Sequence, residues 1–238
     1  DVRFEASQGQ WQGFPKVLRR TVDEANNEIS VTLCYPDTSK HMAGFNPAIY
    51  PDFAFNYTIR VKGEEDHLVL TVDLDKPVPE RFAGKLGFNL ELVPSTLLGK
   101  PWILDEQTGV FPHQAMRPTT RRTNNMDHSG NFNPKGKADL NQLMLDRTTY
   151  NPMIAADIIA EPFAKGNKFV LNPHDDFGKI TIESTQGDLV LYDGRMNHNN
   201  GWFVLRSEFP AGTQKNAVRW IIRPTISKDW KYTPVVQT

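Results

Sequence analysis

The densest cluster of hydrogen-bonding side chains in this chain of 238 residues lies directly before a tryptophan, between residues 193 and 202. Carboxylates, amides and arginine forks can bind sugar hydroxyls, and an aromatic ring can pack on the C–H face of a sugar. The cluster consists of Asp193, Arg195, Asn197, His198, Asn199, Asn200 and Trp202. The same residues suit a structural turn whose polar groups satisfy one another, because Asn-Asn-Gly tolerates positive φ. Both interpretations stay open at this point.

A second candidate set lies on segments in which apolar and polar residues alternate. The polar positions carry arginines, amides, hydroxyls and acids, a composition that suits a carbohydrate cleft. The set is Asn56, Thr58, Arg60, Thr71, Asp73, Asn89, Glu91, Arg219 and Arg223. A solvated sheet face with cross-strand ion pairs would have a similar composition. In the binding interpretation, Arg60, Asn89, Glu91 and Arg219 orient hydroxyls while Trp102 or Trp202 stacks on the sugar.

Two acids in this set also permit a catalytic interpretation. Glycosidic hydrolysis uses a pair of carboxylates flanking the bond to be broken. Asp73 and Glu91 could supply that pair in a jelly-roll glycosidase or lyase, and such an enzyme would lose activity on Glu91→Gln. Their separation decides this alternative, and it depends on the fold.

The sequence favours no metal cluster and no disulfide. The six histidines are scattered and Cys34 is the only cysteine, so the spacing of a zinc site is absent. We predict no cofactor, with one alternative left open, which is a structural Ca²⁺ bound by Asp175 and Asp176 or by Asp193.

The polar positions need a sheet to hold them, and the clearest part of that sheet is a predicted hairpin. Residues 53–62 and 67–74 each alternate apolar and polar side chains. A turn at residues 63–66 would place Val61 opposite Leu68 and Tyr57 opposite Val72, with both apolar sets on one face. A slip by one residue would bury Arg60 and Asp73, so the faces are well determined.

The same alternation recurs at residues 31–33, 85–93, 180–182, 189–191 and 218–222. It predicts about eight to ten strands, with Trp220 in the core, and no long amphipathic helix. We therefore expect an all-β fold, a single antiparallel β-sandwich of jelly-roll type that spans residues 1–238. The pattern disappears between about 105 and 165, which predicts an irregular insertion with a short helix at 137–146. That insertion would cover a sheet edge or wall a ligand cleft.

Composition and chain ends narrow the class of protein. The net charge of −1 gives no basic excess that would attract nucleic acid or an anionic membrane. No segment approaches the 18 apolar residues of a membrane helix, so we predict no membrane span. The start at Asp1 and the extended, linker-like residues 229–238 suggest an excised fragment with further chain after it.

Several segments resemble a known family. They are Gly87–Leu92, Gly99–Asp105, Gly109–Pro112, Arg147–Met153 and Leu191–Trp202. Together they resemble the N-terminal β-sandwich module of large Bacteroidetes-type proteins related to family 9 glycoside hydrolases. The resemblance implies an immunoglobulin-like domain and an (α/α)6-barrel catalytic domain after this chain, and a secreted, cell-surface or periplasmic location. The barrel and its catalytic acids are not in this sequence, so no catalytic residue is transferred.

The leading hypothesis is therefore a non-catalytic carbohydrate-binding module that targets an attached glycoside hydrolase to plant β-glucan-type polysaccharide such as cellulose. Two alternatives remain. One is a structural accessory domain that packs on a catalytic module and binds no glycan, which predicts an exposed apolar patch. The other is the glycosidase or lyase that uses Asp73 and Glu91.

Overall fold

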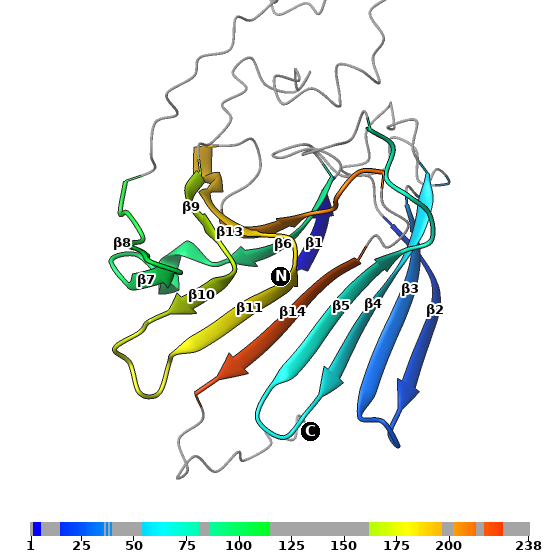
Figure 1. Ribbon diagram of the computed structural model, residues 1–238, viewed down its shortest axis with the longest axis horizontal. Coiled ribbons are helices and arrows are strands. Elements are labelled where there is room, and N and C mark those ends of the chain that lie inside the picture. Colours follow the sequence, from blue (N-terminus) through cyan, green and yellow to red (C-terminus); the bar gives the residue numbers. More distant parts are fainter. Residues whose placement is uncertain are drawn as a thin grey trace, which may run out of the picture.

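Two antiparallel sheets pack face to face in the computed structural model, which confirms the predicted β-sandwich (Figure 1). The structure describes residues 2–5, 15–35, 37, 39, 54–80, 86–114, 162–196, 202–212 and 217–225. The predicted helix at 137–146, most of the predicted insertion and the predicted linker at 229–238 lie outside these residues. The described residues contain no helix long and apolar enough to cross a membrane.

The larger sheet has nine strands and the smaller has five. The larger runs in the order β2 (Lys16–Asp23), β3 (Glu28–Tyr35), β4 (Phe55–Gly63), β5 (Leu68–Leu74), β14 (Ala217–Pro224), β11 (Ile180–Gln186), β10 (Lys168–Leu171), β7 (Pro101–Leu104) and β8 (Gln107–Val110). The smaller runs in the order β1 (Val2–Glu5), β6 (Gly87–Leu92), β13 (Phe203–Glu208), β12 (Leu189–Asp193) and β9 (Pro162–Gly166). Two short 3₁₀ turns, η3 (Pro94–Thr96) and η4 (Gly194–Met196), follow β6 and β12.

The chain passes repeatedly between the two sheets, as in jelly-roll sandwiches. It leaves the larger sheet after β5, β8 and β11 and returns to it at β7, β10 and β14. Side chains from both sheets meet between them, where Phe88 of β6 packs on Trp220 of β14 with ring centroids 5.6 Å apart. Trp220 is fully buried, as predicted, and its indole N–H donates to the Ser207 hydroxyl at 2.8 Å.

The predicted hairpin forms, but its register is shifted by two residues. Val61 lies opposite Leu70, and the turn occupies residues 64–67, closed by the Glu64 N–H donating to the His67 carbonyl at 2.8 Å. Gly63 stays in the strand because it exchanges hydrogen bonds with Asn27 of the neighbouring turn. A shift of two keeps every side chain on its predicted face. Phe55 and Tyr57 are accordingly buried.

Regular structure extends further into the predicted insertion than the sequence suggested. Asp105 and Glu106 form a two-residue turn between β7 and β8, with Asp105 at a φ of 52°. The Asp105 carboxylate accepts the backbone N–H groups of Asn167 and Lys168, each at 2.9 Å. The insertion boundaries at 105 and 165 were therefore wrong, since β8 and β9 are strands at its two ends. With β2 also missed, the described residues form fourteen strands rather than eight to ten.

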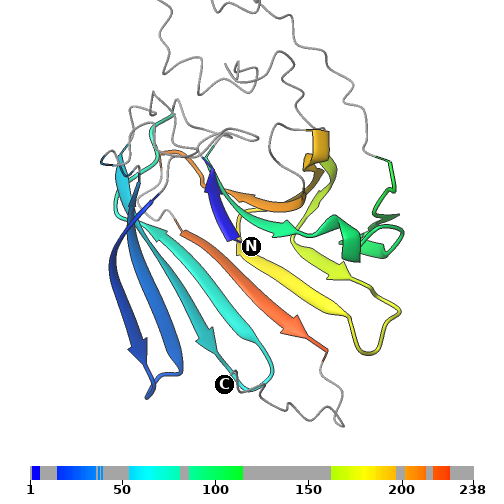
Figure 2. The ribbon, with the colours of Figure 1, turned by 180° about the vertical axis from the view of Figure 1, so that it is seen from behind.

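The smaller sheet covers only part of the larger one. In Figures 1 and 2 the β2–β3 and β4–β5 turns project beyond the five-stranded sheet. Apolar side chains next to these turns are correspondingly exposed, by 42% to 49%: Val22, Ile29 and Leu68. We call these three residues the apolar wing.

Candidate functional site

The predicted site residues do not form one surface. Arg60 and Arg219 lie on the outer face of the nine-stranded sheet, whereas Asn89 and Glu91 belong to β6 of the five-stranded sheet. Sheets in a sandwich lie about 10 Å apart, and these outer faces point in opposite directions. The prediction of a single face that combines all four residues is therefore wrong. His198 and Asn199 lie outside the described residues.

The same topology separates the two acids of the catalytic alternative. Asp73 lies outward on β5 and Glu91 lies outward on β6, so the whole sandwich stands between them. Their carboxyl groups are separated by more than the inter-sheet distance of about 10 Å, whereas glycosidases hold theirs roughly 5–9.5 Å apart. The structure does not bring this pair together for hydrolysis.

The outer face of the nine-stranded sheet carries an ordered array of polar side chains. We call it the polar face, and its described members are Ser30, Thr32, Thr58, Arg60, Lys62, Thr71, Asp73, Glu183, Arg219 and Arg223. Cross-strand contacts hold the array in place. The Thr32 and Thr58 hydroxyls hydrogen-bond at 3.0 Å, and Arg60 forms an ion pair with Asp73. Arg219 is exposed at the centre of the face.

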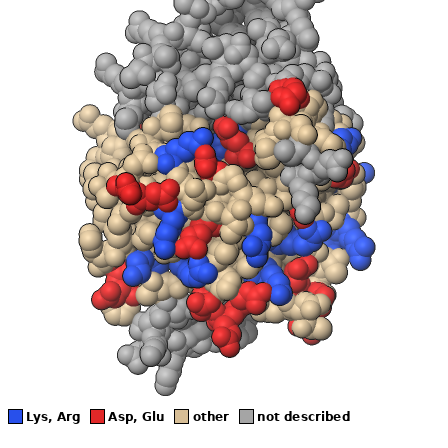
Figure 3. Space-filling model, in the orientation of Figure 1, with Lys and Arg blue, Asp and Glu red and all other residues tan. Residues whose placement is uncertain are grey.

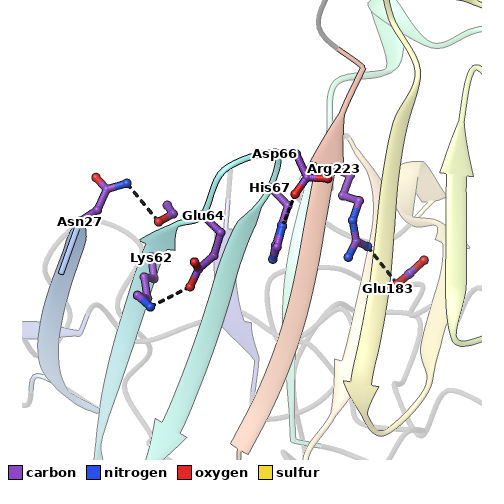
Figure 4. Close-up of polar contacts among 8 residues, drawn as sticks. Asn27, Lys62, Glu64, Asp66, His67, Glu183 and Arg223 are labelled. Atoms are coloured by element: carbon purple, nitrogen blue, oxygen red, sulfur yellow. Dashed lines mark hydrogen bonds and ion pairs between the residues drawn. The ribbon is translucent and has the colours of Figure 1, made fainter.

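Further ion pairs lie at the hairpin end of the polar face (Figure 4). Lys62 donates to Glu64 at 2.7 Å, and this hydrogen bond holds the pKa of Glu64 below its ordinary value. Arg223 donates to Glu183 at 3.0 Å. Glu183 also pairs with Lys168 at 3.1 Å, and the hydrogen bond from Lys168 is the main reason why the Glu183 pKa is lowered.

Charges on the molecular surface are interspersed rather than segregated. On the polar face, three of the four basic side chains pair with a carboxylate, which balances most of their charge: Arg60, Lys62 and Arg223. Figure 3 likewise shows acidic and basic side chains mixed over the face that it displays. Such a surface suits a polar, uncharged ligand better than a polyanion, which needs an excess of Lys and Arg.

The polar residues at the end of β12 bind the protein's own backbone. Arg195 donates to both carboxylate oxygens of Asp193, each at 2.8 Å. Its guanidinium also donates to the carbonyls of Pro112, His113 and Gln114 at 2.8 to 3.1 Å. In the described residues, the structural-turn interpretation thus accounts for Asp193 and Arg195, which clamp the segment after β8 to η4.

Neither tryptophan proposed for stacking lies on the polar face. Trp102 is only 5% exposed and its ring lies nearly parallel to that of Phe163, so the prediction of an exposed platform there is wrong. Trp202 is half-buried against Val190 and Tyr192 of the five-stranded sheet.

The outer face of the five-stranded sheet is buried, and beside the apolar residues Val190, Tyr192 and Val204 it carries polar side chains. Asn89 and Arg206 are fully buried and Glu91 is 5% exposed, and Arg206 donates to the Asn89 side-chain oxygen at 2.9 Å. Gly87 makes room for this guanidinium, because a Cβ at Gly87 would lie 2.5 Å from Arg206 Cζ. We call Gly87, Asn89, Glu91 and Arg206 the buried polar cluster. Sequence reasoning missed Arg206, which follows the apolar residues Phe203, Val204 and Leu205 of β13.

The described residues contain no group of three acids, histidines or cysteines that could hold a metal ion. Of the residues considered for calcium, Asp175 accepts the backbone N–H groups of Phe177 and Gly178 at 2.9 Å each. Asp193 is bound by Arg195. These carboxylates therefore have structural partners within their own loops.

Comparison with known proteins adds no relative: no protein-family model matches the chain, and no curated protein matches it.

Proposed function

We propose that this chain is a non-catalytic carbohydrate-binding module whose polar face holds a neutral polysaccharide of the plant β-glucan type. In this proposal it keeps an attached glycoside hydrolase on its substrate, at the cell surface, in the periplasm or outside the cell. An immunoglobulin-like domain and a catalytic domain would follow it, as the sequence resemblance implies.

The observation that carries the proposal is the ordered array on the polar face, in which three of the four basic side chains pair with carboxylates. The array runs over β3, β4, β5, β14 and β11, a width of roughly 20 Å at the usual strand spacing. Hydroxyls at Thr32, Thr58 and Thr71 and the exposed Arg219 are hydrogen-bonding groups that a sugar can use. Cross-strand pairs fix the neighbouring side chains, so binding would cost little side-chain entropy.

The same array sets the expected strength of binding. The described part of the polar face carries no Trp, Tyr or Phe, so hydrogen bonds rather than stacking would supply the contacts. Each is worth about 0.5–1.5 kcal/mol net. After the cost of association, a dissociation constant on the order of 1 mM is expected.

Native affinity electrophoresis in gels containing β-glucan, xyloglucan, xylan, mannan or no polysaccharide tests the proposal, with product formation assayed on the same sugars. We expect retardation by β-glucan without products, and weaker retardation of Arg219→Ala and Thr58→Val. The matched control is Lys165→Ala, which removes an exposed ion pair with Asp188 on the other sheet. Free migration in every gel would contradict the proposal, and so would equal effects of all three variants.

The apolar wing favours a second candidate, the structural accessory domain. Exposed Val22, Ile29 and Leu68 lie at the turn end of the larger sheet, and an attached domain packed there would exclude water from them. This candidate predicts that the chain binds no glycan in the same gels, whereas the wing variants Ile29→Ser and Leu68→Ser would weaken packing on the attached domain.

A further inference from the structure

The exposed edge of the nine-stranded sheet is β2. Among the described residues β2 pairs only with β3. Six of its eight residues are exposed, namely Lys16 to Arg20 and Val22. An edge strand presents backbone N–H and C=O groups that can pair with another strand. The strand at the opposite edge, β8, has only four residues.

A β-bulge divides β2 into two parts. The register to β3 shifts between Val17 and Arg19, which is a common way to end pairing along an edge. From Arg19 to Asp23 the strand is regular. Arg19, Thr21 and Asp23 lie opposite residues of β3 that point to the polar face, whereas Arg20 and Val22 lie opposite Val31 and Ile29 on the inner face.

We propose that residues 19–23 of β2 pair antiparallel with the same residues of a second copy of this chain. The two-fold axis then passes beside Thr21, whose side chain faces Thr21 of the other copy. Arg19 of each copy lies opposite Asp23 of the other, on the polar face. Directly opposed unlike charges stabilise a pair of strands.

Charge and face alternation select this register from its neighbours. A shift by one residue would place Arg20 and Val22 against residues of the opposite face. A shift by two toward the bulge would place Arg20 opposite itself. A parallel, in-register arrangement would oppose Arg19 with Arg19 and Asp23 with Asp23, and like charges directly opposite destabilise.

The pairing would cover the apolar side chains exposed next to the β2–β3 turn. Val22 and Ile29 of the two copies approach the same axis on the inner face, and each Val22 lies opposite the aliphatic stem of Arg20. A two-fold contact of this kind is closed, and the bulge at Leu18 stops it from extending. The two nine-stranded sheets become continuous.

Sedimentation velocity of the full chain over a range of concentrations tests the proposal. We expect a monomer–dimer equilibrium, and Arg19→Asp should raise the dimer dissociation constant by about tenfold or more, because two attractions become two repulsions. Lys16→Asp makes the same charge change beyond the bulge and should leave the constant unchanged. A monomer at every concentration, or equal effects of the two variants, overturns the proposal.

A cross-link reports the register directly. Opposed residues in antiparallel strands have Cα atoms about 4.5–5.5 Å apart, within the range that a disulfide spans. In a Cys34→Ser background, Thr21→Cys should form a covalent dimer under oxidised glutathione, whereas Thr32→Cys, on the same face of the next strand, should stay monomeric. Equal cross-linking of both variants, or none with Thr21→Cys, would exclude this register.

Discussion

On the outer face of the five-stranded sheet Arg206 is fully buried and bonds Asn89, whereas on the outer face of the nine-stranded sheet the Arg60 side chain is 40% exposed beside Asp73. Both arginines point away from the core, and both have polar partners. The two side chains differ in their access to water. A buried guanidinium depends on its partners because it cannot recover hydration, whereas an exposed one can exchange its partner for solvent or for a ligand hydroxyl. The buried polar cluster is thus structural, and the polar face is the surface available for binding.

Removal of Arg206 should have the largest effect on stability. We expect Arg206→Ala to lower the free energy of unfolding by about 3 kcal/mol, since it leaves a cavity and deprives the buried Asn89 oxygen of its donor. Urea denaturation followed by tryptophan fluorescence measures the loss. Arg219→Ala, on the polar face, should change stability by no more than about 0.5 kcal/mol. Similar losses for the two variants would show that the two faces are energetically equivalent.

Gly87→Ala should have the next largest effect. The added methyl group would collide with the Arg206 guanidinium, and overpacking of this kind costs about 1–3 kcal/mol. In an Arg206→Ala background the collision is gone, so most of the cost should disappear. A double-mutant cycle in urea gives the coupling. If Gly87→Ala still lowers stability in that background, then the loss comes from the β6 backbone and not from the guanidinium.

The same two faces show which structural properties the sequence pattern predicts and which it does not. Alternation in residues 85–93 and 53–74 correctly separated inward from outward side chains on β6, β4 and β5. It does not say to which sheet a strand belongs or what covers its outward side. Asn89 and Arg60 have the same pattern, but one is buried and the other half-exposed. Those properties depend on long-range strand pairing, which a period of two does not encode.

The hairpin register, the insertion boundary at β8 and the exposure of Trp102 were mispredicted for different reasons. The hairpin at Gly63 is set by a contact with Asn27, 36 residues earlier, and a two-residue shift leaves the hydrophobic pattern unchanged. β8 was missed because Gln107 to Val110 is short and mostly polar. Trp102 was misjudged because its ring packs on Phe163, which lies within the predicted insertion. Six members of the polar face were predicted to point outward: Thr58, Arg60, Thr71, Asp73, Arg219 and Arg223.

A smaller effect is expected for the ion pairs on the polar face. A double-mutant cycle on Arg60→Ala and Asp73→Ala should give a coupling of about 0–1 kcal/mol, because both side chains remain in contact with water. The coupling should fall between low salt and 1 M NaCl, where the screening length is about 3 Å. A coupling of several kcal/mol that salt leaves unchanged would mean that this pair behaves like a buried one, and the contrast with Arg206 would be lost.

The smallest predicted effect concerns pH. The hydrogen bond from Lys168, with a second from Arg223, keeps the pKa of Glu183 below its ordinary value of 4.5. A carboxyl whose pKa is lower in the folded state contributes stability above its unfolded pKa, and that contribution is lost as the pH falls through the folded value. Glu183→Gln should therefore make the decline in stability from about pH 5 to pH 3 slightly shallower. Lys168→Met should have a similar effect alone and little additional effect in the Glu183→Gln background, as measured by urea denaturation at each pH. If Lys168→Met acts equally in both backgrounds, then its contribution to acid sensitivity does not pass through Glu183.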